Sequence, residues 1–224
     1  MNVSAIVSAY YAKDFICARL DNLFEQSPQP EIIVVAQLGS FEAEIAKSYG
    51  DRIIHILTPD IPTIYAAWNM AIKASNCDYI ANANCDDYTF PHAYAYMAFI
   101  LDNHPDVGLV YGDEYQFNGE AWPKRKIRPQ GDFELLKKQC FVGPMPMWRK
   151  SLHEKYGYFN EAYKVCGDYE FWLRIAAYGT KLVHLDGALG VYENRAESAE
   201  HRQTDVAMIE KQYLQATYKD LTLI

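Results

Sequence analysis

Residues 78–91 read Asp78-Tyr-Ile-Ala-Asn-Ala-Asn-Cys-Asp-Asp-Tyr-Thr-Phe-Pro91, and this stretch indicates the fold. Its apolar part, Tyr79 to Ala83, is typical of a buried strand and runs directly into Asn84-Cys85-Asp86-Asp87. Ligands of open α/β sheets bind at the edge where the strands end. Two adjacent carboxylates repel each other, so a cation beside them favours their ionisation, and Mg2+ and Mn2+ prefer such hard oxygen ligands. The stretch therefore predicts a site for a divalent metal that carries a phosphorylated ligand.

The segments on either side of this stretch alternate between strand and helix patterns. Apolar, β-branched runs indicate buried strands, and apolar residues at helical spacing indicate helices. The alternation predicts a parallel, doubly wound sheet. Expected strands are 3–8, 31–36, 52–57, 79–83 and 107–111, and expected helices are 14–24, 41–49, 64–74 and 91–103. Beyond Gly112 we expect a long hairpin or loop over 113–131, helices at 133–138, 168–178 and 198–218, an irregular loop over 141–148 and a strand over 181–185.

Composition limits the possible functions. The chain has 224 residues, half of them hydrophobic, which is enough for one large α/β domain or two small ones. A formal net charge of −8 argues against a general nucleic-acid binder, which needs a basic face. The one basic run, Lys124-Arg125-Lys126-Ile127-Arg128, fits either a solvated loop or a surface for an anionic acceptor or a diphosphate.

Cysteine spacing and hydropathy bear on the compartment. The five cysteines are scattered and form no CxxC pair, so a zinc site is not indicated and reduced thiols in a cytoplasmic setting fit best. The amino terminus reads as a first strand instead of a signal peptide. No apolar run approaches the ~18–20 residues that span a bilayer. We expect a soluble cytoplasmic protein, and we leave peripheral association with a membrane open.

Over about residues 2–200 the chain resembles the family 2 glycosyltransferases, which have the GT-A fold. The segments that carry the resemblance, in this order, are Ser4–Tyr10, Glu31–Val35, Ile64–Ile72 leading to Asn84-Cys85-Asp86-Asp87, Gly157–Asn160 and Gly167–Arg174. The resemblance implies a single GT-A domain over 1–224, with a mostly parallel, doubly wound sheet flanked by helices. It divides this domain into a nucleotide-sugar-binding half (1–112), an acceptor and catalytic half (113–200) and a C-terminal helix (201–224).

The family's DxD element corresponds to Asn84-Cys85-Asp86. Asn84 replaces its first Asp, as in a bacterial subgroup with an Asn-x-Asp-Asp variant, and an Asn side chain can hydrogen-bond a ribose or a base. The resemblance implies that Asp86, with Asp87 beside it, holds Mn2+ or Mg2+ and that Asn84 contacts the nucleoside. The alternative is that the acids only cap the following helix.

Asp168 corresponds to the catalytic base in the family's ED element, and Gly167 stands where the preceding acid is usual. A carboxylate at this point would take the proton of the acceptor hydroxyl as it attacks the anomeric carbon. The alternative is that Asp168 is an N-cap at the start of its helix, and both roles can hold together.

The remaining site residues follow from the resemblance. The family's usual acid after the second strand is missing, because Val35-Ala36-Gln37 stands there. Asn69 and Trp148 each have an alternative, as a satisfied helix polar group and as core packing. Expected nucleotide-sugar contacts are Ser8, Ala9, Tyr10, Gln37, Asn69, Asn84, Asp86 and Arg195, and expected acceptor contacts are Asp113, Glu114 and Trp148. His184 and His201 are minor candidates for a further metal ligand.

The resemblance implies an inverting, metal-dependent transfer of a sugar from a UDP- or GDP-linked donor to a glycan or a lipid-linked glycan, with cell-surface polysaccharide assembly as the setting. A nucleotidyltransferase of similar fold would need a phosphate loop rich in Gly and Lys or Arg near the first strand, and residues 8–12 are not one. A third alternative is a nucleotide-sugar or glycan-binding module without activity, because Ala36, Asn84 and Gly167 each replace an acid.

Overall fold

The computed structural model describes residues 2–61, 63–119, 122–194 and 203–223. Within these residues one nine-stranded sheet has the order β3-β2-β1-β4-β8-β6-β9-β5, with β7 paired to β6. The strands are β1 (Val3–Ala9), β2 (Glu31–Gln37), β3 (Ile54–Thr58), β4 (Tyr79–Asn82), β5 (Tyr88–Thr89), β6 (Val107–Phe117), β7 (Lys124–Lys126), β8 (Met147–Arg149) and β9 (Lys181–Glu193). The helices are α1 (Ile16–Phe24), α2 (Phe41–Ser48), α3 (Ile64–Ala74), α4 (Ala93–Asn103), α5 (Phe133–Leu136), α6 (Ser151–Tyr156), α7 (Gly167–Ala177) and α9 (Thr204–Tyr218), with the 3-10 turn η1 at Gly50–Arg52.

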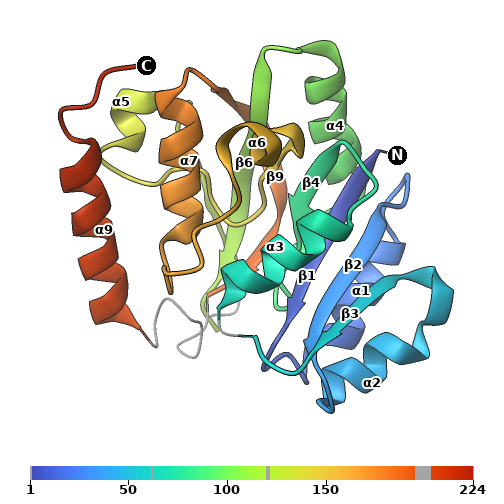
Figure 1. Ribbon diagram of the computed structural model, residues 1–224. Helices are drawn as coiled ribbons and strands as arrows, with labels where there is room; N and C mark the ends of the chain where they lie inside the picture. The colour runs from blue at the N-terminus through green and yellow to red at the C-terminus, as the bar shows by residue number, and fades with distance from the viewer. Residues whose placement is uncertain (1, 62, 120–121, 195–202, 224) are drawn as a thin grey trace.

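The first half of the sheet is parallel. β1 pairs with β2 and β4, and β2 pairs with β3, all in parallel register. Successive side chains of a strand point to opposite faces, and both faces are buried here. Ile6 packs with α3 and α7 in one core, whereas its neighbours Ala5 and Val7 pack with α1, α2 and α4 in the other. Helices therefore cover both faces of the sheet, as Figure 1 shows.

The second half departs from the expected pattern in three places. β8 was not expected: its three residues lie antiparallel between β4 and β6, in a segment whose prolines predict only an irregular loop. β6 continues to Phe117 instead of ending at Tyr111, and it pairs with β7 as a hairpin, which is one of the two forms expected over 113–131. β9 runs to Glu193 along β6 instead of ending at Leu185. Tertiary pairing extends strands that sequence periodicity alone cuts short.

Two helices also differ from expectation. α6 has only six residues, too few for the apolar spacing to show. α7 begins at Gly167, and the residue at its N-cap position is Cys166, whose side chain makes no capping bond. Asp168 is therefore inside the first turn, and its interpretation as the N-cap is wrong.

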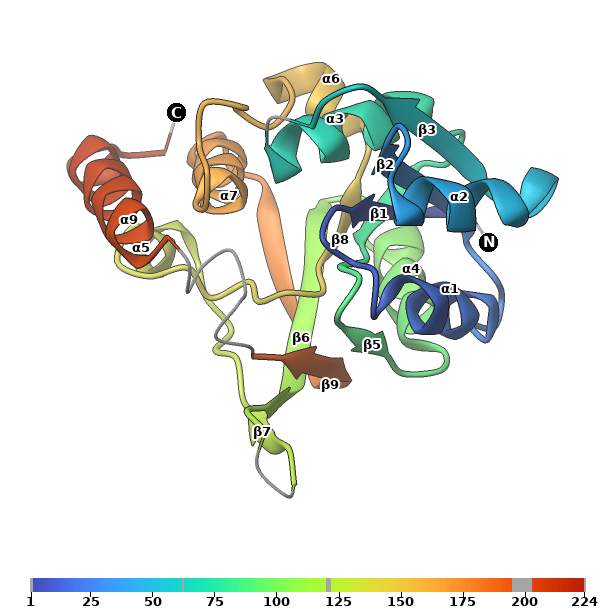
Figure 2. The same cartoon turned by 90° about the horizontal axis from the view of Figure 1, so that it is seen from below.

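The α/β class with a sheet between helices is confirmed, but the sheet is mixed: the pairings of β1 to β4 and of β6 with β9 are parallel, whereas those of β5, β7 and β8 are antiparallel. Figure 2 looks onto the edge where β1 and β2 end, with the hairpin of β6 and β7 projecting away from the body. In the described part of the chain, no helix combines the length and the apolarity needed to cross a bilayer.

Candidate active site

The ends of β1, β2 and β4 form one side of the candidate site. Ala9 at the end of β1 pairs with Ala36 of β2, and Ala83, just after β4, donates its N–H to the carbonyl oxygen of Ile6 at 3.0 Å. Tyr10 follows β1 and is 44% exposed, and its ring centroid lies 4.3 Å from that of Tyr11. Parallel pairing therefore places the expected nucleotide contacts of the first strand beside the turn at 84–87.

The turn at 84–87 is held by its own hydrogen bonds. Asp87 donates its backbone N–H to the carbonyl oxygen of Asn84 at 3.3 Å, and the Asn84 side-chain amide donates to Asp87 Oδ2 at 3.1 Å. The other carboxylate oxygen, Oδ1, accepts the N–H of Glu193 at 3.4 Å. Asp87 thus faces inward and is 5% exposed, whereas Asp86 is partly exposed. The two acids differ in role: Asp86 is accessible, and Asp87 organises the turn.

Burial, together with the charge of Asp86, raises the pKa of Asp87 to about 7, although Arg19 opposes the rise. A cation bound at the turn would favour the ionised form of both carboxylates. Among the described residues, no group of three or more His, Cys, Asp or Glu side chains is placed to hold a metal. Mg2+ commonly takes one or two protein carboxylates and completes its shell with phosphate oxygens and waters. The pair of acids fits an ion of that kind, with Asp86 as the accessible ligand.

Three polar side chains, two in α1 and one just after its end, support this turn from behind, and their role was not predicted from the sequence. Arg19 is 1% exposed and donates through Nη1 to the carbonyl oxygen of Asp87 at 3.2 Å and to Thr89 Oγ1 at 3.0 Å. Asn22 Nδ2 and Gln26 Nε2 donate to the carbonyl oxygen of Thr89 at 2.9 and 3.0 Å. Positions 19 and 22 lie on one face of α1, and Gln26 follows two residues after its end, so this polar spacing in an apolar segment was the available signal.

Asp168 lies in the first turn of α7, where the helix N-terminus favours a negative charge. Its Oδ1 accepts the N–H of Tyr169 at 2.8 Å and lies 3.4 Å from the hydroxyl of Tyr65 in α3. That hydroxyl donates to the carbonyl oxygen of Val165. Burial and the charge of Asp168 raise the pKa of Tyr65, so its hydroxyl stays protonated and able to donate.

Tyr65 also accounts for the glycine beside the expected base. A Cβ atom on Gly167 would lie 2.7 Å from a Tyr65 ring carbon, and real Cβ atoms essentially never lie that close to another heavy atom. The acid usual at this position of the family therefore has no room beside this ring. The departure at Gly167 is a packing exchange with α3.

Two expected donor-side residues differ in burial. Asn69 is 2% exposed, its side-chain amide donates to the carbonyl oxygen of Phe159 at 2.9 Å and to Glu161 Oε1 at 2.8 Å, and its Oδ1 accepts the N–H of Phe159 at 3.0 Å. Its alternative as a satisfied helix polar group is thus the one that the geometry supports. Gln37, at the end of β2, remains partly exposed and donates to the carbonyl oxygen of Pro59 at 3.4 Å.

The three expected acceptor contacts are buried. Trp148 is fully buried and donates through Nε1 to His153 Nε2 at 2.8 Å, so its alternative as core packing applies. Asp113 and Glu114 are each 1% exposed. Arg125 and Arg128 hold them at 2.7 and 2.5 Å. In this structure none of the three presents a surface to an acceptor, because each is enclosed by its own partners.

The two arginines belong to the basic run, so part of that run is turned inward. His184 is also bound there, with Nε2 2.7 Å from Asp113 Oδ1, so its side chain faces the basic run. Arg195 and His201 lie outside the described residues.

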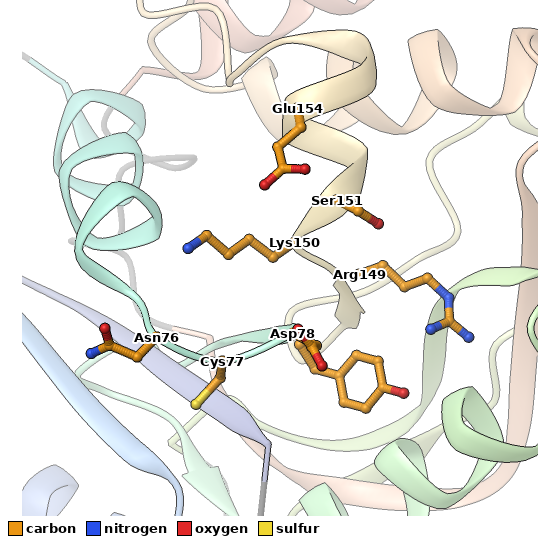
Figure 3. Close-up of a pocket in the computed structure, with 8 residues that line it drawn as sticks. Asn76, Cys77, Asp78, Arg149, Lys150, Ser151 and Glu154 are labelled. Atoms are coloured by element: carbon orange, nitrogen blue, oxygen red, sulfur yellow. The ribbon is translucent and has the colours of Figure 1, made fainter.

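A cleft of about 340 Å3 lies elsewhere, at the start of β4 (Figure 3). Two positively charged side chains in this cleft donate to backbone carbonyl oxygens. Lys150 donates to the carbonyl oxygen of Ser75 at 2.5 Å, and Arg149 donates to that of Val107 at 2.8 Å. This cleft is at the opposite end of β4 from Asp86 and is not part of the candidate site. Its lining residues are Asn76, Cys77, Asp78, Tyr79, Arg149, Lys150, Ser151 and Glu154.

Several proteins are similar to this chain at low sequence identity over most of its length. Residues 4–157 match glycosyl transferase family 2. YwdF, an uncharacterized glycosyltransferase of Bacillus subtilis, is 25% identical over 96% of this chain and 82% of its own length. The uncharacterized glycosyltransferase RP339 of Rickettsia prowazekii is 24% identical over 98% of this chain and 70% of its own. The chain spans only 31% of a similarly named protein of Rickettsia felis.

Solved structures share the fold. S. aureus TarS 1-349 in complex with UDP superposes with a TM-score of 0.74 at 19% identity, over 97% of this chain and 65% of that one. The mannosyltransferase PcManGT of Pyrobaculum calidifontis, in complex with GDP-Man and Mn2+, gives 0.72 at 17% identity, over 96% of this chain and 64% of that one. The likeness confirms the GT-A fold expected from the sequence. Because the match at 4–157 spans more than half of the 224 residues, this chain belongs to glycosyl transferase family 2 and is a glycosyltransferase of the GT-A type.

Proposed function

We propose that this chain, as one domain over 1–224, moves a sugar from a nucleoside diphosphate-sugar to a glycan or a lipid-linked glycan, with inversion and with a divalent cation. One observation carries the proposal: Asp86 and Asp168 lie at the same edge of the sheet. Asp86 follows β4 at that edge, and Tyr65, in the first turn of α3, contacts Asp168. A cation-binding acid and a base thus converge on one surface from distant parts of the chain.

Asp168 takes the role of the general base. Its carboxylate removes the proton of the acceptor hydroxyl while that oxygen forms a bond to the anomeric carbon. The bond from that carbon to the diphosphate oxygen breaks on the opposite side, and its electron pair leaves with the diphosphate. One such displacement inverts the anomeric configuration. The N–H of Tyr169 and the hydroxyl of Tyr65 keep the carboxylate in place.

The donor lies along the ends of β1, β2 and β4 in this proposal. Asp86 holds the cation, and a bound Mn2+ or Mg2+ would neutralise charge that develops on the leaving diphosphate. Asn84 contacts the nucleoside, Ser8, Ala9 and Tyr10 supply backbone and stacking contacts, and Gln37 meets the base. The family resemblance also assigns Arg195 a contact with the nucleotide-sugar. Asp87 supports the cation from inside the turn.

UDP- and GDP-linked sugars are the donor classes that we propose. TarS has been solved with UDP-GlcNAc as well as with UDP, and PcManGT has been solved with GDP-Man. Assembly of a cell-surface polysaccharide is the setting that we infer for the transfer.

A thermal-shift screen tests the donor and the cation together. UDP-GlcNAc, UDP-glucose and GDP-mannose are each added with Mn2+ and with EDTA. A true donor at ~100-fold over its Kd should raise the melting temperature by roughly 5–10 °C. We expect this shift to disappear with EDTA, and release of free UDP or GDP over time to identify turnover. A shift that persists in EDTA would contradict the role of Asp86.

The rival function is an inactive binding module of the same fold. It predicts the same shift in melting temperature without any release of UDP or GDP, whichever acceptor is added. The release assay therefore separates the two functions.

A further inference from the structure

The turn before α7 is bound by a carboxylate from the far end of the chain. Three consecutive backbone N–H groups, those of Lys164, Val165 and Cys166, donate to Glu210 of α9. Glu210 Oε1 accepts at 2.7 Å, and Oε2 accepts at 3.0 and 2.8 Å. Successive N–H groups that converge in this way form a concave site for an anion. Here the protein fills that site with its own side chain.

This turn leads directly into the first turn of α7, which carries Asp168. The N-cap residue Cys166 makes no side-chain capping bond, and its Sγ instead donates to the carbonyl oxygen of Ala207 in α9 at 3.5 Å. The carbonyl side of the turn is held by the Tyr65 hydroxyl at Val165, and its N–H side by Glu210. Two elements therefore fix the backbone from opposite directions, two residues before the proposed base.

The bond is not needed to dock α9. Leu214 is 1% exposed and joins the core that contains α3 and α7. Gln215 donates to the carbonyl oxygen of Lys138, and Lys137 Nζ donates to the carbonyl oxygens of Lys219 and Leu221 at 3.3 and 3.1 Å. These contacts anchor the second half of α9, so a change at Glu210 acts on the turn and leaves the helix attached.

We propose that Glu210 is a positioning residue for Asp168: by binding the three N–H groups it fixes the turn that aims the carboxylate at the acceptor hydroxyl. The inference rests on the proposed function. It gives α9 a role on the acceptor side of the site, and it explains why this C-terminal helix carries an acid that faces the protein.

Glu210→Gln tests the proposal. The amide keeps the size of the side chain but replaces one acceptor oxygen by an NH2 group that faces N–H donors. A misplacement of ~1 Å at a reacting group costs roughly 100-fold in rate. We expect kcat to fall by about 10- to 100-fold while donor Kd, measured by calorimetry, and the KM for the donor stay at wild-type values.

The matched control is Lys137→Met, which removes the bonds to the carbonyl oxygens of Lys219 and Leu221 at the end of the same helix without touching the turn. It should leave kcat within about twofold of wild type, whereas equal losses in the two variants would overturn the proposal in favour of simple helix docking. Wild-type kcat in Glu210→Gln would overturn it outright.

A double variant separates this inference from the proposed function. In an Asp168→Asn background there is no base left to position, so adding Glu210→Gln should cause no further loss. A further loss of tenfold or more would contradict the coupling. If Asp168→Asn itself transfers at the wild-type rate, the proposed base is wrong, and that outcome is distinct from a failure at Glu210.

Discussion

The turn at 84–87 and the turn at 164–168 lie at the same edge of the sheet, and each carries a carboxylate that the proposed reaction needs. They are supported in opposite ways. A buried cation, Arg19, holds the first by its carbonyl side, whereas an anion, Glu210, holds the second by its N–H side. The first support comes from α1, within the parallel half, and the second comes from an outer helix at the end of the chain.

This difference indicates how each turn can be disturbed. Arg19 is 1% exposed, so we expect a substitution there to lower the stability of the core as well as to disturb the site. Glu210 is partly exposed on a helix with other anchors, so a change there reaches the site first. We therefore expect the turn at 84–87 to be coupled to the stability of the fold, and the turn at 164–168 to change with little cost in stability.

The largest effect that we expect is on the base side alone. Asp168→Asn keeps the size of the side chain but removes the proton acceptor, and general bases contribute about 10²–10⁴-fold. Transfer should fall by about 10³-fold, measured by single-turnover assays, with donor Kd unchanged. Loss of donor binding in this variant would contradict the separation of the two turns.

Asp86→Asn gives the next largest effect, on the donor side alone. The amide cannot neutralise a cation, so Mn2+-dependent donor affinity should fall by about 100-fold, or ~2.7 kcal/mol. Calorimetry with and without Mn2+ measures it. Asp78→Asn, at the other end of β4, is the matched control and should keep wild-type affinity.

Arg19→Met tests whether the donor turn is tied to the core. Its removal leaves Asn22 Oδ1 and Thr89 Oγ1 without this buried donor, which costs about 2 kcal/mol in the free energy of unfolding. Urea unfolding measures the loss, and the same variant should weaken Mn2+-dependent binding. If Arg19→Met keeps the wild-type free energy of unfolding but binds the donor more weakly, Arg19 acts on its turn without acting on the core, as we propose for Glu210.

Gly167→Ala gives the smallest effect and tests the packing beside the base. The added methyl group meets the Tyr65 ring, and overpacking typically costs 1–3 kcal/mol, offset in part by the better helix propensity of alanine. We expect a net loss of about 1 kcal/mol in thermal unfolding. Adding Tyr65→Leu should make the substitution at 167 neutral, and an unchanged cost would place the strain elsewhere.

Local pattern was enough to predict the parallel half. The β-branched run at 31–36 and the apolar stretch before Asn84 are strands in the structure because burial on both faces selects such runs. The three-residue β8 and the extension of β9 could not be predicted from local pattern, since neighbouring strands determine them. A short strand forms only where neighbouring strands supply its backbone hydrogen-bond partners.

The candidate site divides in the same way. Asp86 and Asp168 were predicted from motifs, and the structure places both at one edge, although their roles stay predictions. Asn69 and Trp148 have the residue types of a site, yet burial assigns them to the interior. Contacts across 68 residues for Arg19 and 44–46 residues for Glu210 leave no trace in local spacing. Such support is visible only in three dimensions.

The contact between Gly167 and the Tyr65 ring has a consequence for recognising relatives of this chain. A search that demands an acid at position 167 would discard the chain as a degenerate member. The ring and the missing side chain are complementary volumes, so the pair should vary together: a bulky ring at 65 with glycine at 167, or a smaller residue at 65 with an acid at 167. Motif definitions that include both positions would treat the glycine as one of two equivalent solutions to the same space.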